Sequence, residues 1–428
     1  MPLPLPKSRR EIAALQSRRK VVALEQARRA PFFRGKLDHI DATKLDDPAE
    51  WRKIPILDKD MLRSLSDEAF YADFCLKAEG GVAEYWRSGG ATGKPLFYPR
   101  SPADIRYGLL SFRRTLELSG CKPGDSAHVS FPLGIHPVGQ IFARCAAEAG
   151  VAVNWAGAGN NTPSAIQLEL IRSLKPTLWM GMSSYGLHLA NLADARGIDL
   201  AAGSVKTILC SAEPLSDAKR EKIGRLWGAR VFDSFGMTEA GMMGSEDGGA
   251  GGFRIWTDLY HIEVLDPATL EPVKEGETGT LVVTPLWTNN ITPFLRWSSG
   301  DLVVYSEADD GSGPFAVFPK LRHTHRTTGF FKVRGVNVNH AEFEDFVFRH
   351  AQVNDFKCEL VTVGDQETLR LSVELRRGAD AHAVTLDLAR GVKETFEVTP
   401  ALVTLETGTL AKEFEASVKA PRFTDNRT

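Results

Sequence analysis

The chain has 428 residues, of which 43% are hydrophobic and 25% charged, values typical of a globular protein that exclude disordered, collagen-like and membrane classes. Its 52 basic and 54 acidic side chains leave a net charge of −2, so no overall field attracts nucleic acid or anionic lipid, and any anion site must use local basic groups. The length suggests two or three domains, or a large α/β domain with a small one.

The five cysteines are scattered without a Cys-x-x-Cys pair, which argues against a disulfide framework and indicates a reducing compartment. The first residues contain three prolines and no apolar h-region, and no apolar run reaches the length that a bilayer requires. We therefore expect a cytoplasmic protein with neither membrane nor export targeting.

Apolar residues recur at helical spacing between Ser8 and Arg29 and predict an amphipathic helix. Its polar face carries six arginines and Lys20, and we expect this face to be solvated. A short helix is predicted from Lys59 to Leu65.

A glycine-rich segment follows, Ser88-Gly-Gly-Ala-Thr-Gly-Lys-Pro95. Without Cβ atoms its glycines let backbone N–H groups converge on phosphate oxygens, and Lys94 adds a positive charge. Pro95 stands where a Walker A loop has Ser or Thr, and residues 96–98 read as a strand. The pattern predicts a phosphate-binding turn between two strands, with a plain hairpin turn as the alternative.

Strands and helices alternate from Ser101 onward. Ser101-Pro102-Ala103-Asp104 is a helix start with a capping serine, and Gly120 ends that helix. The following elements are expected at 127–131 (strand), 137–149 (helix), 151–155 (strand), 163–174 (helix), 177–182 (strand), 184–196 (helix), 205–210 (strand), 217–227 (helix) and 230–232 (strand). Such alternation predicts a mostly parallel sheet covered by helices, with ligands at the carboxyl ends of its strands.

Two segments follow strands of this sheet, where chemistry is expected: Ser211-Ala-Glu-Pro214 and Asp233-Ser-Phe-Gly-Met-Thr-Glu239. In the second, Phe235 could stack on a purine, and Gly236 would let the base approach the backbone. Thr238 presents a hydroxyl to phosphates, and Glu239 could hold Mg²⁺. Each also has a plain alternative, such as a core aromatic for Phe235 and a surface acid for Glu239.

The pattern becomes β-rich between Phe253 and Phe318 and predicts a small barrel, in which Asp301 could accept the hydroxyls of a ribose or simply form a turn. The polar segment 322–329 is the predicted linker. The sequence thus predicts an α/β protein with a large N-terminal domain, 1–327, containing a β-rich subdomain, and a small α+β C-terminal lid, 328–428.

The ordered motifs resemble the adenylate-forming superfamily of acyl-CoA synthetases and luciferases. These motifs are the glycine-rich segment, Ser-Ala-Glu-Pro, Ser-Phe-Gly-Met-Thr-Glu, Ser-Gly-Asp and Lys332-Val-Arg-Gly-Val-Asn337. The segments 57–63, 295–297 and 419–425 are similar to the phenylacetate-CoA ligase branch in particular. The resemblance covers essentially the whole chain.

The resemblance implies that a carboxylate attacks ATP to form an acyl-adenylate, which coenzyme A then captures. Catalysis would use Thr238, Glu239, which also binds the metal, and Lys419 of the lid. An aromatic acid would occupy a pocket with Phe131, His136 and Tyr185, each of which could equally be a core residue. The nucleotide would be bound by Ser88, Gly89, Gly90, Thr92, Gly93, Lys94, Ser211, Ala212, Glu213, Pro214, Asp233, Ser234, Phe235, Gly236, Met237, Asp301 and Arg326.

The chain departs from the family pattern at five positions. Ala91 replaces a phosphate-facing Thr or Ser, Thr328 and Gly329 replace acidic residues at the hinge, Val418 replaces a glycine, and Lys412 stands where arginine is commoner. These changes bear more on thioester formation than on adenylation.

Three functions are therefore open: an AMP-forming CoA ligase for an aromatic acid, an enzyme that passes its acyl-adenylate to a carrier protein or an amine, and a non-catalytic relative. A homodimer is common among relatives, and no nucleic acid or membrane partner is expected.

Overall fold

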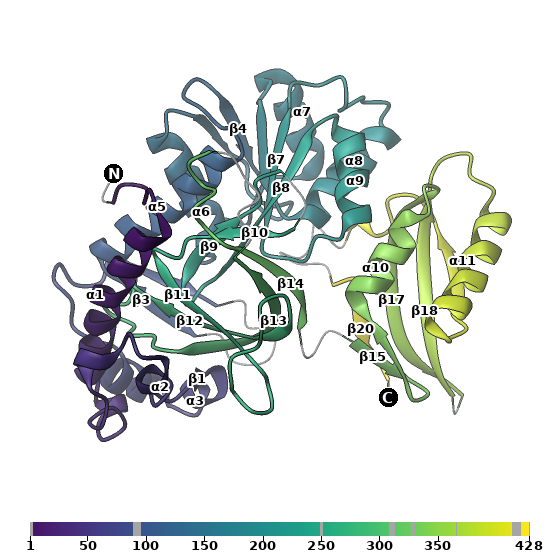
Figure 1. The fold of residues 1–428 in the computed structure, drawn as a ribbon. Helices are drawn as coiled ribbons and strands as arrows, with labels where there is room; N and C mark the ends of the chain where they lie inside the picture. The colour runs from purple at the N-terminus through teal and green to yellow at the C-terminus, as the bar shows by residue number, and fades with distance from the viewer. Residues whose placement is uncertain are drawn as a thin grey trace. The chain divides into compact units, whose positions relative to one another are not determined.

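The computed structural model describes residues 3–88, 96–248, 251–307, 313–326, 330–364, 366–412 and 421–427. Its internal contacts group the chain into two compact units. Unit 1 comprises Met1–Pro123, Gly134–Val151 and Phe232–Thr327, and unit 2 comprises Gly124–Leu133, Ala152–Val231 and Thr328–Thr428. Figure 1 shows the course of the chain. The predicted domain boundary after residue 327 lies among residues 327–329, outside the described residues, and stays a prediction.

Two long helices of unit 1, α1 and α5, begin at residues that cap them. Ser8 accepts a hydrogen bond from the Glu11 N–H at the start of α1, and Ser101 and Asp104 form a capping box at the start of α5. Both predicted helices are confirmed. The helical segments are α1 (Arg9–Arg28), η1 (Pro31–Phe33), η2 (Ala42–Lys44), α2 (Pro48–Trp51), α3 (Lys59–Arg63), α4 (Asp67–Ala69), η3 (Phe70–Phe74), α5 (Pro102–Leu118) and α6 (Pro137–Glu148).

The basic face of α1 is only partly solvated, so the expectation for this face was wrong for three side chains. Lys20 is buried above the Trp51 ring, and the Arg19 guanidinium lies 4.0 Å from the centre of the Trp287 ring. Arg28 donates hydrogen bonds to two backbone carbonyls. Long cationic side chains cover apolar surface with their stems, which a helical pattern alone does not reveal.

The strands of unit 1 are mostly antiparallel. They are β1 (Leu57–Asp58), β2 (Glu84–Arg87), β3 (Phe97–Arg100), β8 (Arg230–Met237), β9 (Gly241–Ser245), β10 (Phe253–Ile255), β11 (Tyr260–Leu265), β12 (Thr278–Pro285), β13 (Trp297–Ser306) and β14 (Lys320–Arg326). Their order is β11-β12-β13-β14-β10-β9-β8; β1 pairs in parallel with β13, and β2 and β3 form a separate hairpin. The strands predicted as a small barrel thus continue into β9 and β8, because β10 pairs with both β9 and β14.

The predicted linker at 322–329 was wrong for its first half. Residues 320–326 form β14, which pairs with β13 and β10, and Leu321 is buried. Polar residues of this strand contact residues of neighbouring strands; His323, for example, contacts Asp301. Composition alone therefore misread a strand whose polar side chains have partners.

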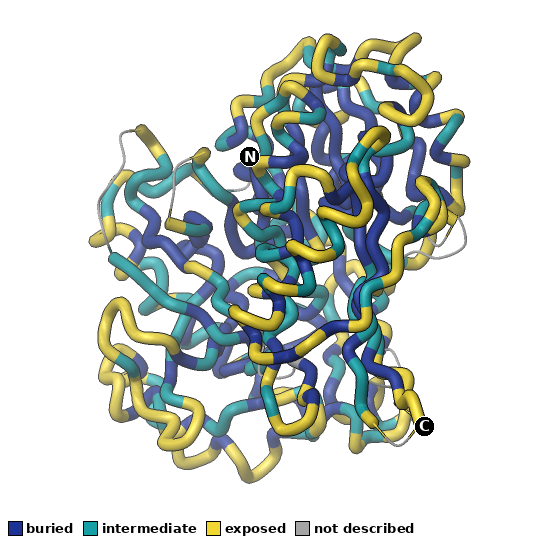
Figure 2. Tube along the Cα trace, turned by 90° about the vertical axis from the view of Figure 1, so that its right-hand side faces the viewer, coloured by how far each residue is buried: buried dark blue, intermediate teal, exposed yellow. Residues whose placement is uncertain are grey.

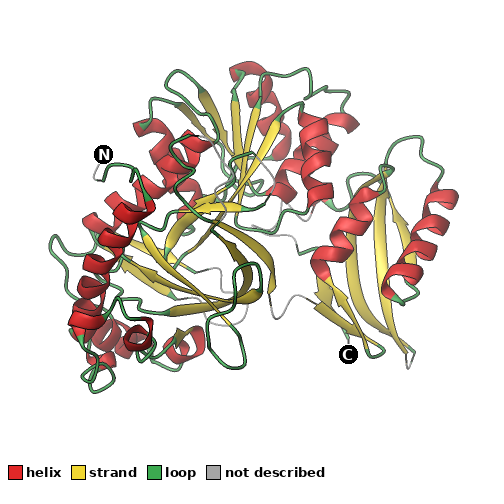
Figure 3. Ribbon diagram, in the orientation of Figure 1, coloured by secondary structure: helices red, strands yellow, loops and turns green. Residues whose placement is uncertain are grey.

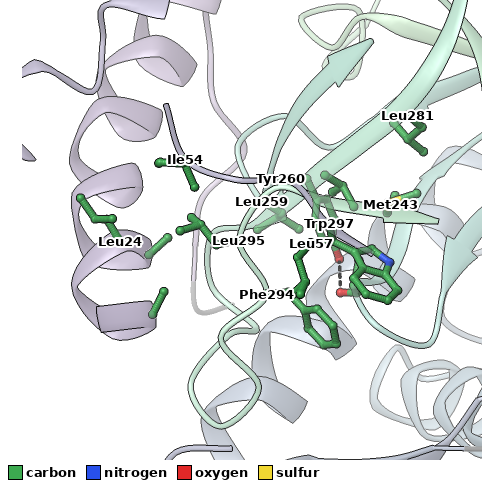
Figure 4. Packing of buried hydrophobic residues seen from close by; sticks show 14 of the residues in the cluster. Leu24, Ile54, Leu57, Met243, Leu259, Tyr260, Leu281, Phe294, Leu295 and Trp297 are labelled. Atoms are coloured by element: carbon green, nitrogen blue, oxygen red, sulfur yellow. Dashed lines mark hydrogen bonds between the residues drawn. The ribbon is translucent and has the colours of Figure 1, made fainter. Parts of the chain in front are cut away.

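The core of unit 1 packs α1 against the strands. Figure 4 shows Leu24 of α1 and Ile54 near Leu295, with Leu57, Phe294 and Trp297 close by. Burying a side chain of this size stabilises the fold by roughly 1.5–3 kcal/mol, because its apolar surface is removed from water. This core joins the first sixty residues to the strand that carries Asp301.

The first part of unit 2 confirms the predicted parallel sheet. Its strands are β4 (Ser126–Val129), β5 (Ala152–Trp155), β6 (Leu178–Gly181) and β7 (Thr207–Ser211), in the order β5-β4-β6-β7, all parallel. Its helices are α7 (Ser164–Leu174), α8 (Ser183–Ala195) and α9 (Asp217–Trp227).

The C-terminal part of unit 2 has the predicted α+β character. It contains β15 (Phe330–Val333), β16 (Val336–Asn339), α10 (His340–Arg349), β17 (Val353–Val363), β18 (Gln366–Leu375), α11 (Ala381–Phe396), β19 (Ala401–Leu405) and β20 (Phe423–Asp425). The main sheet has the order β19-β18-β17-β20. Phe343 and Phe346 of α10 contact Phe396 of α11, so the two helices pack together beside this sheet (Figure 3).

Burial follows the strands, as Figure 2 shows in dark blue, while loops and outer helix faces are exposed. Among the described residues, no helix combines the length and apolar character needed to cross a bilayer.

Candidate active site

The glycine-rich segment joins the two strands of a hairpin, as predicted. β2 and β3 are antiparallel, and Ser88 and Leu96 exchange hydrogen bonds at the base of the turn: Ser88 N–H donates to the Leu96 carbonyl (2.9 Å), and Leu96 N–H to Ser88 Oγ (3.1 Å). Ser88 is buried. Gly89, Gly90, Ala91, Thr92, Gly93 and Lys94 lie outside the described residues.

The segment 233–239 lies mostly within a strand, so the prediction that it follows a strand was wrong. β8 runs to Met237 because it pairs with β9, whose Gly241 and Gly244 face Met237 and Phe235. A Cβ on Gly236 would come within 2.5 Å of the Gly241 carbonyl oxygen. Glycine at 236 is thus required by strand contact, in addition to any ligand.

Phe235 keeps part of its ring exposed. It stacks on Phe253 with ring centres 5.5 Å apart and lies 5.7 Å from the His323 ring. Asp233 and Ser234, by contrast, are buried. A partly exposed ring held by aromatic neighbours is suited to stacking on a planar base.

Asp301 lies within β13, and the structure brings it opposite Arg326 of β14 in the antiparallel register. The carboxylate is buried, with Oδ1 3.1 Å from His323 Nε2, and it accepts a hydrogen bond from Ser299 Oγ. These contacts orient the carboxylate. The contact with His323 was missed by sequence reasoning, since only the pairing of β13 with β14 brings His323 to Asp301.

Thr238 and Glu239 lie in the turn between β8 and β9. Arg100 Nη2 donates to the backbone carbonyls of both residues, and Arg100 Nη1 to the Thr288 carbonyl. The Glu239 side chain is buried, and its Oε1 accepts a hydrogen bond from the Tyr98 hydroxyl (3.1 Å). Burial and the neighbouring Glu239 charge raise the pKa of Tyr98, so Tyr98 remains a donor. Neither Tyr98 nor Arg100 was predicted, because no local pattern marks them.

The segment Ser211–Pro214 follows β7 in unit 2, as predicted. Ser211 is buried, and Ala212 has a left-handed backbone, with φ +73°. The Glu213 carboxylate accepts hydrogen bonds from the hydroxyls of Ser183 (2.6 Å) and Ser184 (2.8 Å) and from the Ser184 N–H. It therefore caps α8, whose own N-cap residue has no side-chain hydrogen bond.

Glu213 remains ionised in this position. Burial alone would raise its pKa, but the Lys219 charge, the Ser183 hydrogen bond, the Arg422 charge and the Ser184 N–H outweigh burial and lower the pKa to about 2. The negative charge thus stays at the N-terminus of α8, where the helix dipole favours it.

The predicted pocket residues are divided between the units. Phe131 and Tyr185 are buried in unit 2, and the Tyr185 hydroxyl lies 2.8 Å from Ser164 Oγ, which is 3.1 Å from His188 Nε2. His136 belongs to unit 1, is half-buried at the start of α6, and has Nε2 3.4 Å from Arg87 Nη1. Their joint role as a pocket stays a prediction.

A buried polar network lies beside Phe131. Gln167 Oε1 accepts a hydrogen bond from Ser130 Oγ (2.7 Å) and lies 3.1 Å from His128 Nε2, while His128 Nδ1 lies 2.9 Å from Asn154 Nδ2. Burial lowers the pKa of His128 to about 4, so the imidazole is neutral at neutral pH.

A network of charges connects α9 to the C-terminal residues within unit 2. Lys219 Nζ lies 3.5 Å from Glu213 and 3.4 Å from Glu344, and Arg422 lies 3.0 Å from Asp355 and 3.9 Å from Glu344. Arg422 follows Lys419, Val418 and the rest of 413–420, which lie outside the described residues, as do Thr328 and Gly329. Lys412 is described and exposed.

Comparison with known proteins shows which sequences and structures this chain is similar to. Residues 88–286 match the sequence model of a family described as "AMP-binding enzyme". The chain is 29% identical to the phenylacetate-coenzyme A ligase of Pseudomonas putida, over 78% of this chain and 74% of the relative. It is 27% identical to that of Escherichia coli strain K12, over 86% of this chain and 84% of the relative.

Among solved structures, the fold is similar to that of 2-hydroxyisobutyryl-CoA ligase in the postadenylation state in complex with R3-HIB-AMP. The TM-score is 0.83 at 22% identity, and the alignment covers 96% of this chain and 88% of the other. This likeness confirms the predicted α/β fold. The ordered motifs, the AMP-binding segment and the similarity to these ligases together support the predicted resemblance to the phenylacetate-CoA ligases of the adenylate-forming superfamily.

Proposed function

We propose that this chain is an ATP-dependent, AMP-forming ligase that activates an aryl or arylacetic acid and transfers its acyl group to coenzyme A. The observation that carries the proposal is its similarity to four phenylacetate-coenzyme A ligases, over 78% to 87% of this chain. The site geometry supports the same chemistry through the residues below.

Two displacements make up the reaction. A carboxylate oxygen attacks the α-phosphorus of ATP, and the bond from that phosphorus to the pyrophosphate oxygen breaks. The thiol sulfur of coenzyme A, after losing its proton, then attacks the acyl carbon, and AMP leaves. A carboxylate is a weak nucleophile toward a polyanion, so the site must neutralise charge during the first step.

The nucleoside would be held in unit 1. Phe235 would stack on the adenine, and Asp301 would accept the ribose hydroxyls, with Arg326 on the adjacent strand reaching the ribose or phosphates. Asp301 is already oriented by Ser299 and His323, so little rearrangement is needed when the ribose binds.

The phosphates would be bound by the glycine-rich segment with Lys94, by Thr238 and, through magnesium, by Glu239. The described residues contain no group of three or more His, Cys, Asp or Glu side chains able to hold a metal ion. A single buried carboxylate such as Glu239 still fits Mg²⁺, which commonly binds through one protein carboxylate and substrate phosphates. Bound magnesium would neutralise phosphate charge, while Arg100 fixes the turn that carries Glu239.

Unit 2 would contribute the remaining parts. The loop Ser211–Pro214 would contact the nucleotide through its backbone, since the Glu213 carboxylate caps α8. Phe131 and Tyr185, with His136 of unit 1, would line the acid pocket, and Lys419 would stabilise the developing charge. A cytoplasmic location and a homodimer complete the proposal; light scattering of the purified protein tests the dimer.

One assay panel tests the function. Aromatic acids are incubated with ATP and Mg²⁺, with and without coenzyme A, and AMP and acyl-AMP are measured. We expect AMP release that depends on coenzyme A. Accumulation of acyl-AMP regardless of coenzyme A would favour transfer to a carrier protein or an amine, and no turnover with any acid would favour a non-catalytic relative.

Replacing the lid lysine tests the mechanism. Lys419→Ala should keep the fold and reduce carboxylate-dependent pyrophosphate exchange by roughly 100-fold or more, the usual scale for removing one charge-stabilising group. Lys393→Ala, at an exposed position of α11, is the matched control and should retain full exchange. An undiminished exchange rate in Lys419→Ala would remove Lys419 from the mechanism.

A further inference from the structure

Arg63 is the last residue of α3, a helix that follows β1 and is held next to β13, the strand that carries Asp301. β1, which precedes α3, pairs with β13 so that Leu57 faces Trp297 and Asp58 faces Ser298, close in the chain to Asp301. Asp58 also caps α3 by accepting a hydrogen bond from the Met61 N–H (2.9 Å). The backbone at Arg63 is therefore held in place by a strand pair, a cap and the buried Leu62.

Among the described residues, no acidic side chain forms an ion pair with the guanidinium of Arg63. Its Nε and Nη2 atoms are buried and, within the described part of the chain, have no hydrogen-bond partner. Arg100 and Arg144 also have an unpartnered Nε, but their other nitrogens donate to carbonyls and to Glu84. Burying hydrogen-bond donors without partners is unfavourable, so these two atoms of Arg63 lower the stability of the fold.

The charge of Arg63 acts on Tyr98. It partly counters the rise in the pKa of Tyr98 that burial and Glu239 cause, which shows that the guanidinium lies within electrostatic range of the Tyr98 hydroxyl. Glu239 accepts its hydrogen bond from Tyr98, and no bond to Arg63 is recorded among the described residues. The guanidinium thus lies within electrostatic range of the hydroxyl that bonds Glu239, the carboxylate proposed to hold magnesium, and its two unpartnered donors remain available to an anion.

Resting on the proposed function, we propose that Arg63 binds the β- or γ-phosphate of ATP, the part that leaves as pyrophosphate. The planar guanidinium can donate two parallel hydrogen bonds to one phosphate, and an anion would satisfy both buried donors. The phosphate is favoured over the acid substrate because Arg63 shares unit 1 with Ser88, Glu239 and Asp301, whereas only one of the three proposed pocket residues, His136, belongs to that unit.

This role predicts that function and stability respond in opposite ways. Arg63→Met removes two buried donors that have no partner among the described residues, so the melting temperature without ligand should stay equal or rise. Arg113→Met is the matched control, since Arg113 is half-buried and paired with Glu117 on the surface of α5. A cation that merely supports the fold would instead lower the melting temperature when replaced.

Ligand-induced stabilisation tests binding without turnover. Melting temperatures are measured with Mg²⁺ plus inorganic pyrophosphate, with Mg²⁺ plus ATP, and with AMP. In Arg63→Met the pyrophosphate shift should vanish and the ATP shift should shrink, while the AMP shift should match that of the wild type. Arg63→Lys should recover part of the pyrophosphate shift, and Arg113→Met all of it.

Kinetics separate the two half-reactions. In Arg63→Met the KM values for ATP and for pyrophosphate in the exchange reaction should rise at least roughly 10-fold, as for loss of a charged hydrogen bond. The KM for the acid and the rate of thioester formation from supplied acyl-adenylate should stay within about twofold. A rise in the acid KM alone would overturn the proposal and assign Arg63 to the acid.

The remaining outcomes are also decisive. An unchanged pyrophosphate shift in Arg63→Met, or a lower ligand-free melting temperature, would overturn the role of Arg63 while leaving the proposed function intact. A wild-type protein that responds to neither ATP nor pyrophosphate would overturn both.

Discussion

Buried charges are organised differently in two regions of this molecule. Between α9 and the C-terminal residues, Lys219 and Arg422 each contact two carboxylates. Around Tyr98, Arg63 has buried donors without a partner in the described residues. A charge that is paired within the protein supports the architecture, whereas a charge that is left unpaired is retained for a ligand.

The largest effect should come from breaking a fully paired charge in the same unit as Arg63. Arg114 donates two hydrogen bonds to Asp258, at 2.6 and 2.7 Å, and both side chains are buried. Arg114→Met should lower the free energy of unfolding by about 3–5 kcal/mol, because it leaves Asp258 buried and unpaired. Urea denaturation of Arg114→Met and Arg63→Met measures the contrast, and equal losses in the two variants would break the comparison.

The next largest effect concerns His128, a buried side chain that is neutral in the folded protein. His128 is neutral in the fold because burial lowers its pKa to about 4, while its pKa in the unfolded chain is near 6.5. Between these two pKa values the unfolded state binds more protons than the folded state. The contribution of His128 to stability is therefore complete above pH 6.5 and is lost as pH falls toward 4.

The size of this loss can be measured by difference. The pKa change corresponds to about 3 kcal/mol, so the unfolding free energies of the wild type and His128→Gln should converge by up to about that amount between pH 7 and pH 4. Parallel pH profiles of the two proteins would show that His128 does not contribute.

A smaller effect is expected for one pair within the unit 2 network. A double-mutant cycle of Lys219→Met and Glu344→Gln should give a coupling energy of about 1–2 kcal/mol, since their atoms are 3.4 Å apart and Lys219 is buried. Glu213 keeps Lys219 partly paired in the Glu344 variant, which limits the coupling. Amide hydrogen exchange near Glu344 should increase in Lys219→Met, and a zero coupling energy would show that the network is not a stabilising one.

The smallest effect is expected for a solvent-screened ion pair, which serves as the reference for the buried charges above. Arg113 and Glu117 form a partly exposed pair one helical turn apart on α5, with side chains about one-third exposed. Arg113→Met should change the unfolding free energy by less than about 0.5 kcal/mol, because solvent and salt screen the pair. A larger loss would mean that exposure does not separate the two classes of charge.

The sequence predicted elements whose causes are local. The capped helix at Ser101, the strand β5 and the helix α9 were expected within a residue or two of their observed bounds. The alternation of strands and helices also predicted the parallel sheet correctly. Caps and periodicity act over a few residues, so a single chain segment carries the information.

Features that depend on distant partners were missed. β14 was read as a linker because its polar side chains have partners on other strands, and β8 was ended too early because β9 extends it. In the candidate site, Glu239 and Asp301 were singled out, but Tyr98, Arg100 and His323 were not, since hydrogen bonds across 22 to 141 residues leave no local pattern.

The two-residue strand β1 also limits how the enzyme can be divided. The family match begins at residue 88, yet the ladder of Leu57 and Asp58 on β13 lies upstream of that point. A fragment cut at the family boundary would expose the edge of β13 at Trp297 and Ser298 and delete Arg63 together with its supporting helix. Shuffling of such catalytic modules, by engineers or by evolution, would therefore have to carry the N-terminal segment along as part of the transferable piece.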